Sequence, residues 1–282
     1  MDRKNVFELK KEHAWSDITV ERKEGFGTSL TGYHKHSYYE INLILSGDVK
    51  ILLGDRTEDG FGGRMVLTSP DVPHYISCDD NVLYKRIYLL FTRDFIDNRL
   101  PEWNRLSLLF GRSGSVFSLS DNDMACCLSV IDEIERETDP LSRRLLTYYL
   151  LSRLSNYISS PENIKKENKL PAYVIDALSY IESNYSKRFN ADDVANELHI
   201  GRTTLLTGFK KHTGITFGEY SARCRLSHAI GLLSAGQTLE LTAQSCGFAD
   251  VGGLIRSFKK YFGATPRKYV TEKLFWGQKD GH

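Results

Sequence analysis

The 282-residue sequence lacks any run of about 18 apolar residues, the length that a membrane-spanning helix needs. Its first residues carry charges with no apolar segment behind them, so no secretory signal is expected. Cysteine is scarce, and no pair has C-x-x-C spacing among Cys78, Cys126, Cys127, Cys224 and Cys246. These absences argue against a membrane protein, a disulfide framework and a zinc finger, and favour a protein of the reducing cytoplasm.

Charge of one sign is not in large excess either, because the formal net charge is +1. The balance hides an asymmetry: residues 171–282 hold 14 Lys and Arg against 10 Asp and Glu, an excess of +4. Such an excess is compatible with a polyanion partner, although basic surface is often only solvated surface. The chain length and an apolar content of 41% favour two domains, each with its own core.

The residues from 27 to 91 predict short β-strands. Runs rich in β-branched and aromatic residues alternate there with Gly, Asp and Pro, and these runs begin at Tyr38, Asp48, Met65 and Val82. Many short strands at close spacing are typical of an antiparallel sandwich or barrel. We therefore predict an all-β domain over residues 1–120.

Helical periodicity replaces this pattern from residue 121. Residues 121–158 contain two apolar stripes, typical of two helices that pack on each other or across a dimer. The first stripe is Cys127, Val130, Ile131 and Ile134, and the second is Leu145, Leu146, Tyr149, Leu150 and Leu154. The polar residues 159–170 are interpreted as a linker, and residues 171–282 are expected to be helical.

One segment of the C-terminal part occurs twice. Residues 205–220 and 254–269 align at an offset of 49 positions with seven identities in sixteen positions, among them a Leu, a Phe, a Lys pair and a Gly. Two apolar residues four apart, followed by lysines and a glycine, predict a short helix with one buried face that ends at the glycine. The duplication therefore predicts two copies of one helical unit.

Each copy is preceded by another short helix. Asn190 is a candidate N-cap for a helix that ends at a turn near His199, and the next helix follows from Arg202. The second copy repeats this order with a longer turn around Gly247. Two such units form a double helix-turn-helix, and residues 217–233 predict a connecting helix of about 25 Å, suited to the ~34 Å spacing of successive major grooves. A helical repeat that binds protein is the alternative.

This combination resembles the DNA-binding domain of the AraC/XylS family of bacterial transcription regulators over residues 171–270. The motifs are Leu205-x3-Phe209-Lys210, Arg225, Leu232-Leu233, Gly247-Phe248-x-Asp250, Phe258-Lys259-Lys260-x2-Gly263 and Thr265-Pro266-x2-Tyr269. In the N-terminal part, His34-Lys-His36-x3-Glu40-x6-Gly47 and Pro70-Asp-Val-Pro-His74 are similar to the motifs of the family's sensor domain. The resemblance implies a cupin-like all-β barrel with a helical dimerisation region, followed by an all-α double helix-turn-helix.

The resemblance also implies that the second helix of each unit enters the major groove of double-stranded promoter DNA. The expected base-reading residues are Arg202, Thr203, Leu206 and Thr207 in the first unit, and Val251, Gly252, Gly253, Ile255 and Arg256 in the second. Phosphate contacts are expected from Lys210, Lys211, Lys259, Lys260 and Arg267. Gly252 and Gly253 depart from the family pattern because they remove side chains, so phosphate anchoring is expected to dominate in the second unit. Arg225 is expected to brace the domain.

The sensor half raises the question of a metal. His34, His36 and Glu40 share strand parity, and together with His74 they are the ligand types usual in cupin metal sites. Regulators of this family generally keep the barrel without metal chemistry, so we predict no metal and no cofactor. The resemblance favours an effector pocket instead, lined by His34, His36, Asn42, His74, Arg86 and Tyr88. Structural histidines at a sheet edge are the alternative.

The preferred function is a ligand-responsive transcription regulator of the cytoplasm, without enzyme activity or membrane contact. A small effector in the barrel would reposition the two helix-turn-helix units relative to promoter DNA and RNA polymerase, and residues 121–158 would supply much of a homodimer contact. Two alternatives stay open. One is a cupin metalloenzyme with an appended DNA-binding domain, and the other is a regulator whose barrel only dimerises.

Overall fold

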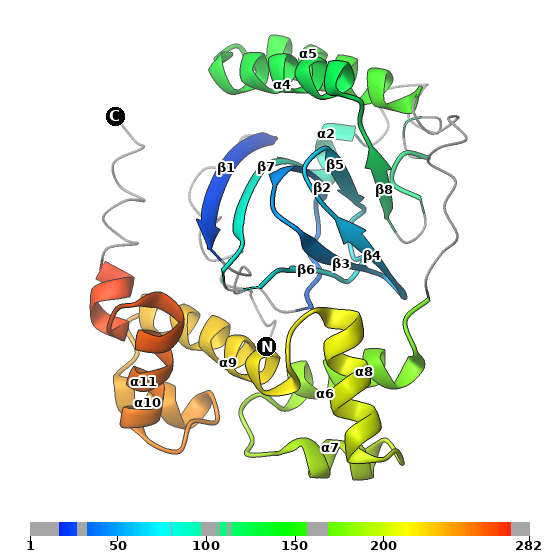
Figure 1. Cartoon of the computed structure of the whole chain (residues 1–282). Helices are drawn as coiled ribbons and strands as arrows, with labels where there is room; N and C mark the ends of the chain where they lie inside the picture. The colour runs from blue at the N-terminus through cyan, green and yellow to red at the C-terminus, as the bar shows by residue number, and fades with distance from the viewer. Residues whose placement is uncertain are drawn as a thin grey trace.

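The computed structural model describes residues 17–26, 33–79, 81–96, 106, 108–111, 114–156 and 169–271 of the chain. Strands occupy the N-terminal part and helices the C-terminal part, which confirms the predicted fold class (Figure 1). Within the described ranges, no helix has both the length and the apolar character to cross a membrane.

The N-terminal part contains two antiparallel sheets. One has the strand order β1-β7-β2-β5-β8 and the other the order β4-β3-β6. The strands are β1 (Ile18–Phe26), β2 (Tyr39–Ser46), β3 (Val49–Leu53), β4 (Arg56–Gly60), β5 (Arg64–Thr68), β6 (His74–Ser77), β7 (Leu83–Phe91) and β8 (Ser115–Ser118), with a short helix α2 (Arg93–Ile96) after β7. The four predicted runs correspond to β2, β3, β5 and β7.

The two sheets enclose a common interior. Because successive residues of a strand point to opposite faces, Ile41 and Leu43 of β2 lie in one apolar cluster and Ile44 lies in another. The interior cluster joins Ile44 to side chains of both sheets, namely Val49, Ile51, Leu53, Val66, Val72, Cys78 and Tyr84. Glu40 and Asn42 share the face of Ile44, so these two polar side chains point into the barrel.

Helices α4 (Asp121–Arg136) and α5 (Pro140–Ser155) cover the opposite face of the five-stranded sheet. The first predicted stripe is buried there as expected. The second stripe is divided, because Leu150 is buried whereas Leu145 and Tyr149 are 58% and 48% exposed. The helices therefore complete the core of the barrel domain and also present an outer apolar face.

The C-terminal part has the predicted order of helices. They are α6 (Ala172–Asn184), α7 (Ala191–Glu197), α8 (Arg202–Thr213), α9 (Phe217–Ser234), α10 (Leu239–Ser245) and α11 (Val251–Phe262). The turn of the first unit comprises residues 198–201 and that of the second residues 246–250, so the second is one residue longer as predicted. At Asn190, the predicted cap of α7, the side chain accepts hydrogen bonds from the amides of Asp192 and Asp193.

The first helix-turn-helix unit packs directly on the three-stranded sheet, below the barrel in Figure 1. Leu52 and Tyr75 point away from the barrel interior and share an apolar cluster with side chains of α6, α8 and α9. At the end of α8, the carbonyl group of His212 accepts a hydrogen bond from the Thr57 hydroxyl at 3.2 Å. The second unit, α10 and α11, has a separate core. The barrel therefore holds the first unit and leaves the second to α9.

The predicted linker, residues 159–170, lies mostly outside the described residues, which resume at Lys169. There the chain is attached to the start of β4. The amide of Leu170 donates a hydrogen bond to the Asp55 carbonyl at 2.7 Å, and Lys169 pairs with Arg56 in an isolated β-bridge. These backbone contacts hold the end of the linker against the barrel.

Candidate nucleic-acid interface and effector site

Both candidate recognition helices end as the repeat predicts. α8 and α11 stop at Gly214 and Gly263, whose φ angles are +80° and +65°, a conformation that glycine adopts at little cost. A Cβ at Gly214 would lie 3.0 Å from Cγ of Lys50 in the barrel. Around Gly263 the described residues leave open space. The two copies share their helix ends, but the first copy is docked and the second is not.

Most of the predicted base-reading residues of the first unit are exposed. Arg202, Thr203 and Thr207 lie on the side of α8 opposite to its buried apolar face. Leu206 differs, because it is partly buried and packs against the core of the unit. Nε of Arg202 lies 3.3 Å from Oδ1 of Asp192 in α7, so an exposed ion pair orients this guanidinium.

One glycine of the second unit, Gly252, has a local structural reason. The Asp250 carboxylate caps α11 by accepting a hydrogen bond from the amide of Gly253 at 2.6 Å. A Cβ at Gly252 would lie 3.1 Å from both that carboxylate and the Arg256 guanidinium. Arg256 itself is 76% exposed, 3.8 Å from Asp250. Gly252 therefore leaves room for the cap and for Arg256, while Val251 and Ile255 are partly buried.

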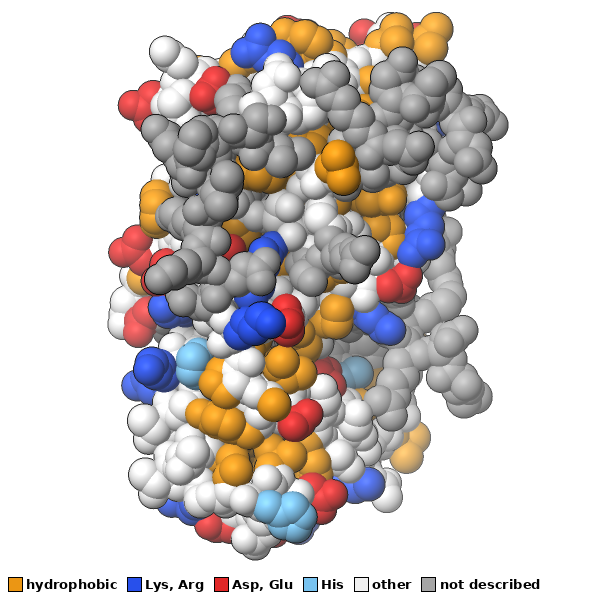
Figure 2. All heavy atoms as spheres, turned by 90° about the vertical axis from the view of Figure 1, so that its right-hand side faces the viewer, with side chains coloured by type: hydrophobic (Ala, Val, Ile, Leu, Met, Phe, Trp, Pro, Cys, Tyr) orange, Lys and Arg blue, Asp and Glu red, His pale blue; other side chains and the backbone are white. Residues whose placement is uncertain are grey.

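The predicted phosphate-contact residues are all exposed: Lys210, Lys211, Lys259, Lys260 and Arg267. The first four lie in the last turns of the two recognition helices. Exposed cations at helix ends suit phosphate oxygens, which position a protein without reading sequence. Figure 2 shows that basic side chains are dispersed over one face of the molecule, and that hydrophobic side chains gather on its lower part.

Arg225 braces the domain, as the sequence analysis expected. Its Nε and Nη2 donate hydrogen bonds to the carbonyl groups of Tyr185 and Lys187, at 3.1 and 3.0 Å. Its guanidinium also lies 5.1 Å from the centre of the Phe189 ring. These contacts tie α9 to the segment after α6, so this arginine is engaged within the protein.

Sequence reasoning missed one close approach, at Gly208 of α8. A Cβ there would lie 1.9 Å from the hydroxyl oxygen of Tyr173 in α6. Glycine therefore lets α6 and α8 approach each other. The repeat carried no signal for it, because the position 49 residues later is Ser257.

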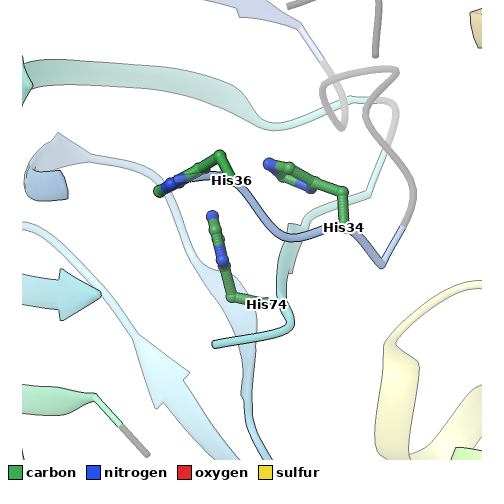
Figure 3. A group of neighbouring side chains, drawn as sticks. All are labelled: His34, His36 and His74. Atoms are coloured by element: carbon green, nitrogen blue, oxygen red, sulfur yellow. The ribbon is translucent and has the colours of Figure 1, made fainter. Parts of the chain in front are cut away.

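In the barrel, the three predicted histidines come together (Figure 3). His34 and His74 lie opposite each other, because the amide of each donates a hydrogen bond to the carbonyl of the other at 3.0 and 2.8 Å. The ring centroid of His74 lies 4.4 Å from that of His34 and 4.8 Å from that of His36. One ligand nitrogen from each ring lies within 4.8 Å of the others. The rings therefore converge on one point inside the domain.

The Glu40 carboxylate completes this buried group. Its Oε2 lies 3.2 Å from Nε2 of His36 and 3.9 Å from Nε2 of His74. Burial by itself raises the pKa of this carboxyl, but the hydrogen bond with His36 and the neighbouring imidazoles outweigh it and lower the pKa to about 2. Burial lowers the pKa of His74 to about 4. At pH 7 Glu40 is ionised and His74 is neutral.

The other predicted effector residues adjoin this group. Asn42 lies opposite Tyr88 in the β2–β7 register, on the same face as Glu40. Arg86 donates a hydrogen bond from Nε to the Tyr88 hydroxyl at 2.9 Å. All three side chains are buried, and neither polar atom of the Asn42 amide group has a hydrogen-bond partner among the described residues. The structure thus brings the six predicted effector residues together inside the barrel.

A groove of about 650 Å³ lies on the outer side of α4 and α5. Its charged residues are Glu133, Arg136 and Glu137, at the end of α4. The other lining residues belong to α5 and are Ser142, Leu145, Leu146 and Tyr149. Leu141, one turn before Leu145, is 64% exposed. The exposed part of the second predicted stripe therefore forms a surface with an apolar floor.

Two family models match the chain. One is described as an AraC-like ligand binding domain and matches residues 23–151, and the other is a helix-turn-helix domain that matches residues 194–272. The chain belongs to the AraC family. This AraC-family chain is 24% identical to the Msm operon regulatory protein of Streptococcus mutans, over 95% of this chain and 94% of that protein. The identification confirms the predicted family and its two-domain organisation.

Two further proteins are similar to this chain over most of its length. The melibiose operon regulatory protein of Escherichia coli is 22% identical to the AraC-family chain, over 84% of this chain and 82% of that protein. The crystal structure of ToxT from Vibrio cholerae is 16% identical, covers 90% of this chain and 97% of its own, and superimposes with a TM-score of 0.37. As an AraC-family member, the chain is a transcription regulator with a ligand-binding N-terminal domain and a DNA-binding C-terminal domain.

Proposed function

We propose that this regulator binds promoter DNA through both helix-turn-helix units, under the control of an effector bound inside the barrel. The proposal rests on one combination: two exposed recognition helices, one of them docked on a barrel whose interior holds buried polar side chains. Two relatives are regulatory proteins of operons. We infer that this chain also controls an operon, in the cytoplasm where bacterial promoters lie.

In the proposed complex the two units have unequal tasks. Arg202 and Arg256 are exposed and suited to guanine in the major groove, while Thr203, Leu206 and Thr207 offer methyl and hydroxyl groups to bases. Gly252 and Gly253 supply no side chains, so the second unit relies more on phosphate contacts. Those contacts would come from Lys259, Lys260 and Arg267, with Lys210 and Lys211 in the first unit.

A homodimer is the second part of the proposal. The groove on α4 and α5 has an apolar floor with a charged rim, as protein interfaces do. Leu141, Leu145 and Tyr149 would lie at the centre of the contact. Two copies would place four recognition helices on adjacent DNA half-sites, where RNA polymerase is the expected further partner.

The proposed effector is a small molecule held by His34, His36, Asn42, His74, Arg86 and Tyr88. We infer no enzyme activity, since the relatives are transcription regulators. The alternative of a cupin metalloenzyme predicts turnover that depends on the histidine cluster. The alternative of a barrel that only dimerises predicts that no ligand of the barrel changes DNA affinity.

Footprinting of the purified protein on fragmented bacterial DNA at a stated salt concentration tests the proposal. The expected result is protection over about two successive major grooves, weakened at particular bases by Arg256→Ala. Arg93→Ala is the matched control, because Arg93 is an exposed arginine of the barrel domain that faces Asp71 as Arg256 faces Asp250. Protection no stronger than that of a nonspecific basic protein would contradict the proposal.

A further inference from the structure

Arg86 is a buried cation of the barrel that forms no ion pair with a carboxylate of the described residues. We propose that the effector is a hydroxylated carboxylic acid, whose carboxylate binds the Arg86 guanidinium. Its hydroxyl groups bind Asn42, Thr68 and Tyr84. The inference rests on the proposed function, because it names the chemical class of the effector that the barrel binds.

The Arg86 guanidinium lies beside two tyrosines of its own strand. Its carbon atom Cζ lies 4.3 Å from the centre of the Tyr84 ring and 5.6 Å from that of the Tyr88 ring, and Nε donates to the Tyr88 hydroxyl at 2.9 Å. Burial lowers the pKa of Arg86, but the neighbouring Tyr88 and Tyr84 outweigh it and raise the pKa above its ordinary value. Arg86 is therefore charged at pH 7. The ring faces attract this charge without neutralising it.

A second buried arginine of the barrel shows how such a charge is accommodated when a partner exists. Nη1 of Arg64 lies 3.5 Å from Oε2 of Glu58, on the neighbouring sheet. The exposed fraction of Arg64 is 4% and that of Arg86 is 8%, so the two side chains are similarly buried. A buried charge is costly unless it is paired. Arg86 therefore calls for an anion that Arg64 does not need.

The carboxylates on the strands beside Arg86 are engaged elsewhere. Glu21 of β1 pairs with Lys23 at 2.8 Å. Glu40 of β2 pairs with His36 at 3.2 Å. The Nε hydrogen of Arg86 is used by Tyr88, which leaves the four hydrogens on its two terminal nitrogens, and a carboxylate accepts two of these side by side.

Three polar side chains of the interior have unmade hydrogen bonds. Both polar atoms of the Asn42 amide, the Thr68 hydroxyl and the Tyr84 hydroxyl lack partners among the described residues, and each side chain is at most 1% exposed. Burial raises the pKa of Tyr84 well above its ordinary value, while the nearby Arg86 and Asn42 act in the opposite direction, so these groups are neighbours. Unmade hydrogen bonds are costly in a buried site. Ligand hydroxyl groups satisfy all of them, because a hydroxyl both donates and accepts.

The strand register gives this interior a polarity. Arg86 lies opposite Ile44 of β2, whereas Thr68 lies opposite Glu40, and Asn42 lies between these positions. Four residues of an extended strand span about 13 Å. A carboxylate at Arg86 is therefore separated from the ionised Glu40, and a hydroxyl beside Thr68 can also donate to Glu40. The arrangement favours a single negative charge at one end of the ligand and hydroxyl groups toward the other.

Isothermal titration calorimetry of the full-length protein tests the class with D-glucuronate, D-galacturonate and D-gluconate. At least one of these acids should bind with one molecule per chain. It should bind at least about 10-fold more tightly than D-glucose and D-galactose, which lack the carboxylate, and than hexanoate, which lacks the hydroxyl groups. Equal binding of a neutral sugar or of hexanoate would overturn the proposal. So would no binding of any of the three acids at millimolar concentration.

Arg86→Met removes the charge and keeps most of the side-chain length, and it should lower the affinity for the bound acid at least about 10-fold. Arg22→Met is the matched control. It makes the same change at an arginine of β1 that pairs with Asp132 and Glu135 of α4. This variant should bind the acid as the parent does. An equal loss in both variants, or parent-like affinity in Arg86→Met, would overturn the assignment.

Asn42→Leu provides a second variant with a stability readout. It replaces an amide group without partners by an apolar group of similar size, so the ligand-free variant should melt at the same or a higher temperature than the parent. Its affinity for the acid should fall. A strongly lowered melting temperature without ligand would show that the amide is satisfied in the free protein, and would overturn its role as a ligand contact.

The effector role has its own readout. Saturation with the bound acid should change the affinity for a footprinted DNA site by about 5- to 150-fold, and Arg86→Met should abolish that change. Unchanged DNA affinity would overturn the effector role and keep the acid site. Acid binding that depends on Arg86, without any footprint, would contradict the proposed function. A footprint without binding of any acid would keep DNA binding and overturn the acid site.

Discussion

Tyr220 of the DNA-binding domain is hydrogen bonded on both sides of the domain boundary: its hydroxyl accepts from the amide of Tyr33 in the barrel and donates to Glu182 in α6. Tyr220→Phe removes both bonds and takes away the partner that the part-buried Tyr33 amide has in Tyr220. We expect a loss of about 1–3 kcal/mol in the free energy of unfolding. Urea denaturation measures it, and hydrogen exchange at the Tyr33 amide should accelerate. Unchanged exchange there would contradict the proposed contact.

Gly208→Ala should be strongly destabilising although alanine is the better helix former. The new Cβ would overlap the Tyr173 hydroxyl, so the Tyr173 ring must move or α6 and α8 must separate, which costs about 1–3 kcal/mol. Gly218→Ala in α9 is the matched control, because nothing among the described residues lies within 4 Å of its Cβ. It should be neutral or stabilising. Equal thermal stability of the two variants would show that the close approach is wrong.

Leu145→Glu should disrupt the proposed homodimer by placing a charge on the apolar floor of the groove. Light scattering after size-exclusion chromatography at micromolar concentration measures the mass. Leu241→Glu makes the same change at a leucine of α10 that is 51% exposed, and it should keep the parent's mass. A monomeric parent protein, with and without DNA, would count against the dimer.

Lys259→Ala and Lys260→Ala should weaken DNA binding uniformly across sequences, whereas Arg256→Ala should act at particular bases. Each lost phosphate contact lowers the slope of log affinity against log salt by about 1. The loss of a base contact costs about 1–3 kcal/mol at its own position. Fluorescence anisotropy with specific and scrambled DNA over a salt series separates the two effects. An unchanged salt slope in the double lysine variant would remove these lysines from the interface.

The reactivity of the cysteine thiols at a fixed pH tests which cysteines are buried. Burial, with a contribution from the neighbouring Cys126, raises the pKa of Cys127 to about 11, and burial raises that of Cys246 to about 12. At pH 8 both stay protonated and unreactive, because the thiolate is the nucleophile. The partly exposed Cys126 should react with an aromatic disulfide reagent while the buried four do not. Several fast thiols in the folded protein would contradict the described core.

Much of this organisation could be read from local patterns. These patterns are short-range features, because side-chain periodicity and helix capping depend on residues only a few positions apart. They are the duplication, the Asn190 cap, the terminal glycines and the change from strand to helix periodicity at residue 121. The sequence patterns do not predict β1 and β4, whose apolar patterns are weaker. The second apolar stripe predicts a single surface on α5, whereas packing against the sheet buries Leu150 and leaves Leu145 and Tyr149 exposed.

The sequence by itself determined the two domains and the doubled unit, and it supplied the side chains that we propose to contact DNA or an effector, since each depends on periodicity or on a motif of a few residues. Only the tertiary structure decided that the first unit is docked on β3 and β6, that Gly208 admits Tyr173, and that the ring nitrogens of His36 and His74 converge on Glu40. These relationships join residues far apart in the chain. They arise from how whole elements pack, which no local pattern records.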